Sequence, residues 1–377
     1  MKFLIAPDSF KESLSAAEVA SAIKMGFESV LPEAKFHLLP MADGGEGTCD
    51  ALVAATGGEL FRYQVTGPLG GHVDAALGIL GGGKTAVIEM ATAAGLDLVA
   101  PEARNPAITT TYGVGELILK ALDHGIRHIV IGLGGSATND AGAGMLQALG
   151  AQLFDAHGQP LVHGGLALAD LAGIDLSQMD SRLAECHFEL ACDVNNPLTG
   201  PQGASWIFGA QKGADKALQH ELDLALKHFA ECTEKQTGIH IDQVAGAGAA
   251  GGLGAAFIGF LNAEVRRGVD LVLALNRFDE YSREAVWVIT GEGRIDGQSI
   301  FGKTPVGVAE HAKRQGCKVI ALAGSLGDGY EKVYRHGIDA VFSVVPGVCS
   351  LSEALENAHD NIVRTARNIA ETMRLSA

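Results

Sequence analysis

The fold is decided near the N-terminus by the stretch FLIAPDSFKESLSAAE, residues 3–18. Residues 3–6 form a short apolar run that stops at Pro7-Asp8, which is typical of a buried strand rather than of a helix. A helix begins after Ser15, because the Ser15 hydroxyl and the Glu18 carboxylate form a capping box that satisfies backbone donors on both sides. A strand that leads directly into a helix is the first element pair of a parallel α/β sheet.

The same alternation continues after this first pair and returns near the C-terminus. Further strands are expected at residues 36–41, 286–290, 318–323 and 340–345, and further helices at 48–55, from Thr304 and from the second capping box at Ser350. Five strands that alternate with helices predict a doubly wound parallel sheet, interrupted by a long middle segment.

The middle segment is expected to be an inserted second α/β domain. We place it at residues 63–276, which leaves residues 1–62 and 277–377 as a discontinuous first domain. Its expected elements are a hairpin of strands at 74–80 and 85–90, an apolar strand at 128–133 and an amphipathic helix at 215–236. A chain of 377 residues is long enough for two domains, because single cores stop growing at roughly 250–300 residues.

The composition disfavours several classes of protein. A net charge of −16 disfavours nucleic acid and anionic membranes as partners, because both would be repelled. The six cysteines include no C-x-x-C pair, which disfavours a zinc site or a disulfide framework and favours a reducing compartment. No apolar run approaches the ~20 residues that span a bilayer, and no signal peptide is recognisable. We expect a cytoplasmic protein that acts on small molecules, and leave a homo-oligomer open.

Four predicted strand ends combine glycine with acidic residues. They are DSFK at 8–11, DGGEGT at 43–48, GLGGSATND at 132–140 and TGEGRID at 290–296. In open parallel sheets, ligands bind beyond the carboxyl ends of strands. Glycine lets the backbone approach a phosphate, and Asp or Glu can hold Mg²⁺. Each loop taken alone fits a solvated turn with a capping Asp as well as it fits a ligand-binding loop. The presence of four such loops in one chain favours a site for a nucleotide and a metal.

Two further segments carry candidate catalytic residues. In CDVNNPL, residues 192–198, Asp193 can take the proton of a substrate hydroxyl as a general base, although an Asx turn is the commoner meaning of such a sequence. In GKTP, residues 302–305, Lys303 precedes a helix with proline in its first turn, so its ammonium can meet a phosphate there or remain solvated.

Two motif matches and the histidines are given less weight as signs of function. Residues 78–85 match the Walker A motif literally, but the residues after Lys84 read as a strand instead of a helix. Residues 246–251 match a dinucleotide-binding pattern, yet the strand expected before them, at 239–244, is weak. The thirteen histidines show no spacing typical of catalytic zinc, and His128 is expected to be a core residue.

Read together and in order, the four strand-end loops, CDVNNPL and FGKTP strongly resemble the motifs of the type-I bacterial glycerate kinases. The resemblance spans essentially the whole chain. It implies Mg²⁺-dependent transfer of the ATP γ-phosphoryl group to D-glycerate and leans toward 2-phosphoglycerate over 3-phosphoglycerate. It also implies a flavodoxin-like domain interrupted by a second α/β domain, and a hairpin in place of the Walker A loop.

Phosphoryl transfer depends on positioning and charge neutralisation, so the loops suggest a set of roles. Our hypothesis makes Asp193 the base, gives Mg²⁺ to Asp43 and Asp296, and places Lys11, Arg294 and Lys303 on phosphates or on the glycerate carboxylate. The remaining nucleotide-binding candidates are Asp8, Ser9, Gly44, Gly45, Glu46, Gly134, Gly135, Ser136, Asn196, Gly291 and Glu292.

Two other functions stay open at this point. One is a nucleotide- or dinucleotide-dependent oxidoreductase of a small hydroxy acid, built on residues 246–251. The other is a regulator that binds a sugar acid without catalysis.

Overall fold

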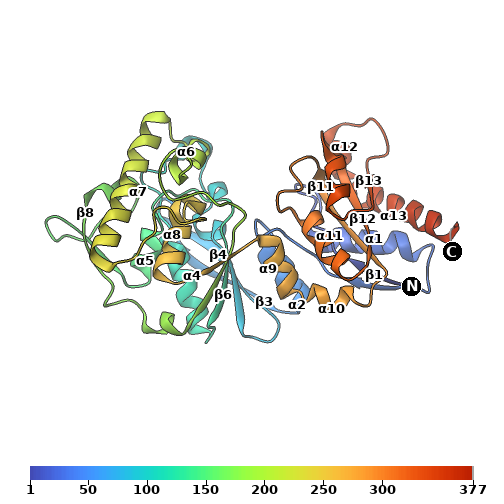
Figure 1. The fold of residues 1–377 in the computed structure, drawn as a ribbon, viewed down its shortest axis with the longest axis horizontal. Coiled ribbons are helices and arrows are strands. Elements are labelled where there is room, and N and C mark those ends of the chain that lie inside the picture. The colour runs from blue at the N-terminus through green and yellow to red at the C-terminus, as the bar shows by residue number, and fades with distance from the viewer. Residues whose placement is uncertain (376–377) are drawn as a thin grey trace. The chain divides into compact units, whose positions relative to one another are not determined.

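The computed structural model describes residues 1–375, which fold into two compact units (Figure 1). The first unit comprises Met1–Gly57 together with the chain from Arg267 onward, and the second comprises Gly58–Arg266. The sequence-based division into two domains at 62/63 and 276/277 stays a prediction. No helix among residues 1–375 is both long and apolar enough to cross a membrane.

The first unit contains a five-stranded sheet whose paired strands are all parallel. Its order is β13 (Ala340–Ser343), β12 (Lys318–Leu326), β11 (Trp287–Ile295), β1 (Lys2–Ile5) and β2 (Lys35–Leu38). Numbered along the chain, this order is 2-1-3-4-5, the flavodoxin-like form of the doubly wound sheet. The α/β fold class predicted from the sequence is therefore confirmed.

Helices cover both faces of this sheet. They are α1 (Ala16–Glu28), α2 (Thr48–Thr56), α9 (Gly268–Leu275), α10 (Phe278–Ser282), α11 (Thr304–Arg314), α12 (Leu351–Glu356) and α13 (Ala358–Leu375), with a 3₁₀ turn at Tyr330–His336. Helices α1 and α13 lie side by side over a core that includes Phe3, Phe27 and Ile289 (Figure 1). Helix α11 packs on β11 and β12 and buries Val306 and Ala309.

The expected helix starts of the first unit are confirmed. Ser15 and Glu18 form the capping box of α1, and Ser350 and Glu353 form that of α12. One helix was expected from the Ser350 capping box, but the structure has two, because α12 ends at Glu356 and α13 begins at Ala358.

The second unit contains a mixed six-stranded sheet. Its order is β10 (Glu264–Arg266), β9 (His187–Ala191), β6 (His128–Gly132), β5 (Thr85–Glu89), β4 (His72–Ile79) and β3 (Glu59–Thr66), the last two antiparallel to their neighbours. A separate hairpin joins β7 (Gln152–Asp155) to β8 (Leu171–Asp175).

One large core unites this sheet with its helices, and contains Ile88, Ile129 and Phe257. The α-helices are α3 (Ala91–Ala94), α4 (Tyr112–Asp123), α5 (Ala143–Ala148), α6 (Ala204–Phe208), α7 (Lys216–Thr237) and α8 (Leu253–Phe260). The 3₁₀ turns are Leu96–Leu98, Pro101–Ala103, Leu166–Asp170, Ser181–Glu185, Ala210–Lys212 and Ala249–Gly252. The helix expected at 215–236 is α7, which has Asp215 as its N-cap and ends at Thr237, before Gly238 with a φ of +75°.

The structure shows which elements the two glycine motifs and the segment 290–296 form. Strands β4 and β5 pair as an antiparallel hairpin, so the Walker A match is a hairpin, as expected. Residues 239–244 form no strand, so the pattern at 246–251 lacks the element that a dinucleotide fold requires before it. The expectation of a loop at 290–296 is wrong, because β11 continues to Ile295 and pairs with Leu326 of an equally extended β12.

Candidate active site

A cavity of about 420 Å³ lies in the first unit, beyond the carboxyl ends of β1, β2 and β11. Its polar lining contains Ser9 and most of the charged residues predicted for that unit: Asp8, Lys11, Asp43, Glu292, Arg294 and Lys303. These side chains come from segments up to 295 residues apart, counted from Asp8 to Lys303, and the parallel strand order brings them together. The cavity is therefore the place where a ligand would meet them.

Asp8 is held at the end of β1 by hydrogen bonds to both carboxylate oxygens. The Thr304 hydroxyl donates to Oδ2 at 2.5 Å, and the Ser9 amide donates to Oδ1 at 2.6 Å. Burial, followed by the negative charge of Asp43, raises the pKa of Asp8 to about 6. Two carboxylates thus repel each other inside the cavity. Thr304 belongs to the predicted GKTP segment, in which only Lys303 was given a role.

Glu292 belongs to β11 and is only 9% exposed. The Ser299 hydroxyl donates to Oε1 at 2.9 Å, and the Lys303 ammonium lies 3.3 Å from Oε2. Burial raises the pKa of Glu292 to about 7, although Lys303 opposes that rise. A carboxyl group with this pKa can gain or lose a proton near neutral pH.

Arg294 and Asp296 form an ion pair at the end of β11, with 3.1 Å between Arg294 Nε and Asp296 Oδ2. The Gln298 amide donates to the other carboxylate oxygen at 2.9 Å, and this hydrogen bond is the main reason that the pKa of Asp296 is lowered. Arg294 lines the cavity, whereas Asp296 is not among the lining residues. Asp296 therefore orients Arg294.

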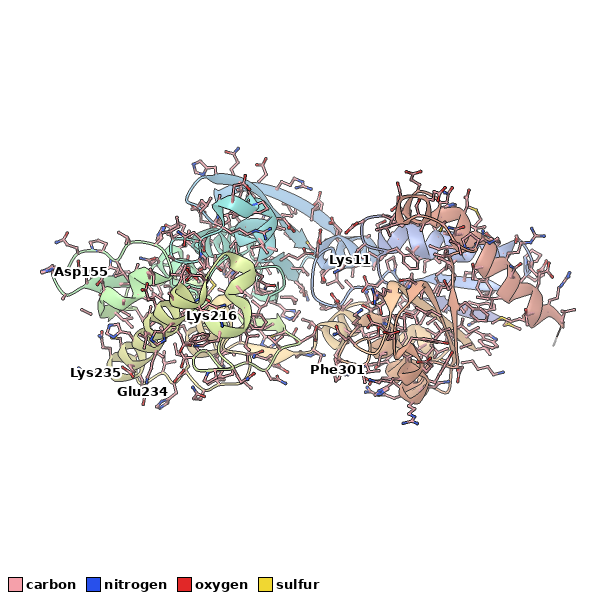
Figure 2. All side chains as sticks on the ribbon, turned by 90° about the horizontal axis from the view of Figure 1, so that it is seen from above. Lys11, Asp155, Lys216, Glu234, Lys235 and Phe301 are labelled. Carbon is pink, nitrogen blue, oxygen red and sulfur yellow. The ribbon has the colours of Figure 1, made fainter. Side chains whose placement is uncertain are left out.

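Lys11, labelled in Figure 2, is exposed in the loop after β1. The loop after β2 is shaped by its own contacts, because the Gly45 amide donates to Asp43 Oδ1 at 3.0 Å and Gly44 has a φ of +91°. Glu46 lines a second cavity of about 420 Å³ in this unit, together with Asp8 and Ser9.

The glycine loop of the second unit follows β6. Gly134 and Gly135 are exposed, while Ser136 is buried. The ammonium of Lys212 donates at 2.7 Å to the Ser136 hydroxyl and at 2.7 Å to the Thr138 carbonyl oxygen. Lys212 is 1% exposed, and burial lowers its pKa to about 7. Sequence reasoning missed Lys212, since no motif surrounds it and its partners lie more than seventy residues away.

Asp140 at the end of the same loop is fully engaged by protein donors. Its oxygens accept hydrogen bonds from the Thr111 amide and hydroxyl and from the amides of Gly142 and Gly144, at 2.9–3.3 Å. Burial raises the pKa of Asp140, and these hydrogen bonds oppose the rise. Asp140 therefore fixes the backbone at the start of α5.

The loop after β9 carries Asp193, which is exposed, and Asn196, whose side-chain amide donates to the Gln202 carbonyl oxygen at 2.8 Å. The glycines at 246–252 pack against this region. A Cβ on Gly248 would lie 2.2 Å from the Pro197 carbonyl oxygen, and one on Gly251 would lie 1.9 Å from the Thr138 carbonyl oxygen. These glycines are explained by close packing within the second unit.

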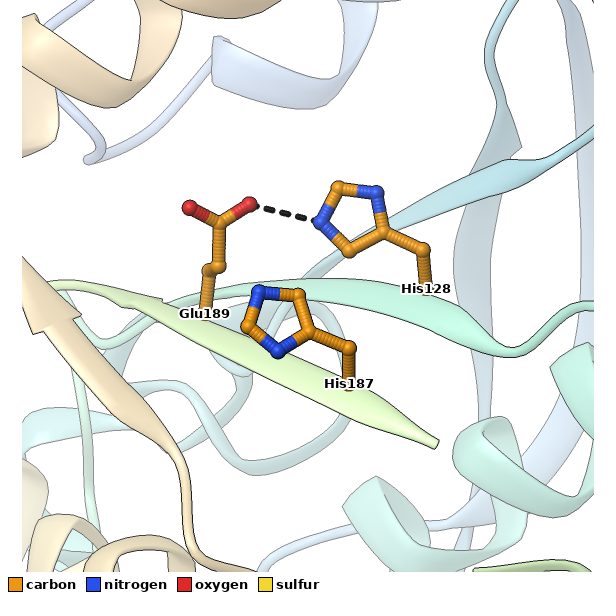
Figure 3. A group of neighbouring side chains, drawn as sticks. All are labelled: His128, His187 and Glu189. Carbon is orange, nitrogen blue, oxygen red and sulfur yellow. Dashed lines mark hydrogen bonds and ion pairs between the residues drawn. The ribbon is translucent and has the colours of Figure 1, made fainter. Parts of the chain in front are cut away.

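A cluster of His128, His187 and Glu189 lies at the amino ends of β6 and β9 (Figure 3). His128 Nε2 is 2.6 Å from Glu189 Oε2, and Arg266 donates to the other carboxylate oxygen at 2.6 Å. The expectation of a core His128 is wrong, because its side chain is 29% exposed. Potential metal-ligand atoms of the three residues lie within 4.8 Å of one another. Both oxygens of Glu189 are already engaged, one by His128 and the other by Arg266. The cluster is therefore explained as an ion-pair network.

Comparisons with known proteins agree along the full chain. Residues 3–374 match the glycerate kinase family. The chain is 54% identical over 375 residues to the glycerate 2-kinase of Escherichia coli K12, covering 100% of this chain and 98% of that protein. It is also 54% identical over 376 residues to a glycerate kinase of Bacillus subtilis 168, with the same coverage.

A solved structure gives the same result for the fold. The crystal structure of a glycerate kinase 2 from Salmonella typhimurium LT2 superposes with a TM-score of 0.92 at 51% sequence identity, covering 100% of this chain and 99% of the other.

Proposed function

The chain belongs to the glycerate kinase family, and on that premise we propose that it transfers the γ-phosphoryl group of ATP to the 2-hydroxyl of D-glycerate, giving 2-phosphoglycerate and ADP. The observation that carries the proposal is the first-unit cavity, where Asp8, Asp43 and Glu292 stand with Arg294 and Lys303. Carboxylates and cations gathered in one cavity are what phosphoryl transfer requires, since its catalysis is almost entirely positioning and charge stabilisation.

The carboxylates of this cavity fit Mg²⁺. They are hard oxygen donors, and burial together with the negative charge of Asp43 raises the pKa of Asp8, so a bound cation would stabilise both charges. We assign the metal to Asp43 and Asp8, and assign Asp296, whose oxygens are engaged by Arg294 and Gln298, to the orientation of Arg294. Bound Mg²⁺ would neutralise charge on the phosphate oxygens of ATP.

The cations of the same cavity bind the phosphates. Lys303 immediately precedes α11, so its ammonium and the positive end of the helix attract the same anion. Glu292 holds this ammonium at 3.3 Å and so limits its movement. Arg294 and Lys11 line the cavity as further phosphate ligands.

Two residues are candidates for the base that takes the proton of the glycerate hydroxyl. Asp193 is exposed after β9, as a residue that receives a substrate must be. Glu292 has a pKa of about 7, which suits proton transfer near neutral pH. Replacing the base by its amide is expected to lower kcat by about 10² to 10⁴, so Asp193→Asn and Glu292→Gln measured side by side identify it.

The second unit offers an anion site in its glycine loop. Gly134 and Gly135 expose their backbone, and Lys212 fixes Ser136 beside them. We assign this loop to the binding of a substrate anion through backbone donors. A cytoplasmic location remains a prediction from composition.

The reaction and its regiochemistry can be tested in one tube. Phosphorus NMR of a mixture of enzyme, ATP, Mg²⁺ and D-glycerate is expected to show ADP together with 2-phosphoglycerate. Formation of 3-phosphoglycerate would refute the assigned hydroxyl, and the absence of any phosphoglycerate would refute the kinase activity.

A further inference from the structure

The first-unit cavity has an apolar part that the proposed reaction leaves unexplained. It is formed by Val344, Val345, Leu351, Ala354, Leu355 and Ala358. Glycerate, phosphate and Mg²⁺ are all polar or charged, so none of them gains by contact with these side chains. A ligand that uses the whole cavity must combine an apolar portion with an anionic one.

The apolar part comes from the chain after β13 and from helix α12 with the start of α13. Leu351 is 72% exposed, and Ala354 and Leu355 are partly exposed, so a ligand could cover them. Removing apolar surface from water contributes roughly 25 cal/mol per Å². This part of the cavity therefore offers binding energy that is independent of charge.

Helix α12 is joined to the loop that presents Lys11. The Ser13 hydroxyl donates to the Leu355 carbonyl oxygen at 2.8 Å. Between Lys11 and Ser13, Glu12 has a φ of +63°, a left-handed conformation that is unfavourable for a residue with a Cβ and is held in place by its surroundings. The apolar side chains and a phosphate-binding lysine thus belong to one connected structure.

We propose that the apolar part of this cavity binds the adenine ring of ATP, with the triphosphate extending to Lys11, Arg294 and Lys303. The proposal rests on the function proposed above, because it takes ATP as the phosphoryl donor. A flat, largely apolar ring with an anionic tail matches a cavity that is apolar in one part and carries three cations in another. Its volume of about 420 Å³ lies within the roughly 300–1,000 Å³ of ligand pockets.

The test places a bulky side chain in the apolar part without altering a charge. Ala354→Trp is expected to raise the KM for MgATP at least about tenfold, which corresponds to about 1.4 kcal/mol, while the KM for D-glycerate stays within about twofold. Ser352→Trp is the matched control, because Ser352 is exposed on the same helix and does not line the cavity. It is expected to leave both KM values unchanged.

A direct binding measurement separates this proposal from the function on which it rests. Titration calorimetry with MgADP needs no turnover, and Ala354→Trp should weaken MgADP binding by the same factor even if glycerate is not the acceptor. Should Ala354→Trp fail to fold, Leu351→Asp replaces it, since Leu351 is exposed and its replacement adds a charge to the same surface. Unchanged MgADP affinity, or a rise in the KM of glycerate alone, would overturn the proposal.

Discussion

Both units have loops that combine glycine with acidic residues, but the charged side chains are accessible to a ligand in the first unit and buried in the second. In the first unit, Asp8, Glu292 and Lys303 line a cavity, and their charges are available to a ligand. In the second unit, Lys212 and Asp140 are almost completely buried, and their hydrogen bonds hold the glycine loop. The same combination of glycine and acid can therefore build either a binding surface or the internal support of a loop.

The difference follows from hydrogen bonding. Asp140 accepts hydrogen bonds from Thr111, Gly142 and Gly144, so its charge is stabilised by the protein itself. Glu292 has Ser299 and Lys303 as neighbours, and burial raises its pKa to about 7, just as burial raises the pKa of Asp140. We expect substitution of the cavity carboxylates of the first unit to change the reaction rate, and substitution of Lys212 or Asp140 in the second unit to change stability.

Among residues that are assigned a single role, the largest effect is expected from Asp43→Asn. Loss of one preorganised charged group typically costs about 10² to 10³ in rate, so kcat/KM should fall by that factor while the urea midpoint of unfolding stays unchanged. Steady-state kinetics at saturating Mg²⁺ measure the first quantity. Glu33→Gln, at an exposed carboxylate of the same unit, is the control and should behave as wild type. A rate for Asp43→Asn within threefold of wild type would contradict the assignment.

Lys212→Met tests whether the buried charge of the second unit contributes to stability. It leaves the Ser136 hydroxyl and the Thr138 carbonyl without their donor, and each unsatisfied buried group costs about 1–3 kcal/mol. The free energy of unfolding should fall by about 2–4 kcal/mol in urea titrations, with a smaller loss of kcat than in Asp43→Asn. Lys216→Met, at the exposed lysine labelled in Figure 2, is the matched control. Full stability with a thousandfold loss of rate would make Lys212 a ligand contact instead.

Lys212 also predicts how stability depends on pH. Its folded pKa of about 7 lies below the unfolded value of about 10.4, so between these values the unfolded state binds more protons. The free energy of unfolding should therefore rise with pH over this window, by up to about 1.4 kcal/mol per pH unit, and the burial cost should be fully present below pH 7. Urea titrations at pH 7 and pH 9 should show this increment in wild type and not in Lys212→Met. Equal increments in both proteins would refute it.

The smallest effect is expected from Thr304→Val. The change removes the hydroxyl that donates to Asp8, a hydrogen bond worth about 1 kcal/mol, so kcat/KM should fall about fivefold. Thr304→Ser keeps the hydroxyl and should retain most of the activity. If both variants lost the same amount of activity, the methyl group and not the hydrogen bond would be responsible.

Local signals predicted much of the fold. The structure confirms the capping boxes at Ser15 and Ser350 and the hairpin of β4 and β5. Each of these features is encoded by residues that are close together in sequence. The extension of β11 was missed because it depends on pairing with β12, and a glycine-rich segment reads as a loop when its partner strand is unknown.

The candidate site was predictable only where it consists of motifs. The strand ends carrying Asp8, Asp43 and Glu292 were found, and the cavity brings those residues together. Lys212 and Ser299 were not found, and Thr304 was quoted within GKTP without a role, because each acts through a contact made by the folded chain. His128 was misjudged since its partners Thr85 and Glu189 lie on other strands.

The central claim is that the first-unit carboxylates support glycerate phosphorylation. Its most direct test is phosphorus NMR of matched tubes containing ATP, Mg²⁺, D-glycerate and either wild type or Asp43→Asn. We predict that 2-phosphoglycerate accumulates with wild type and forms at least about a hundredfold more slowly with an equally folded Asp43→Asn. Equal rates of product formation, or no phosphoglycerate in the wild-type tube, would contradict the claim.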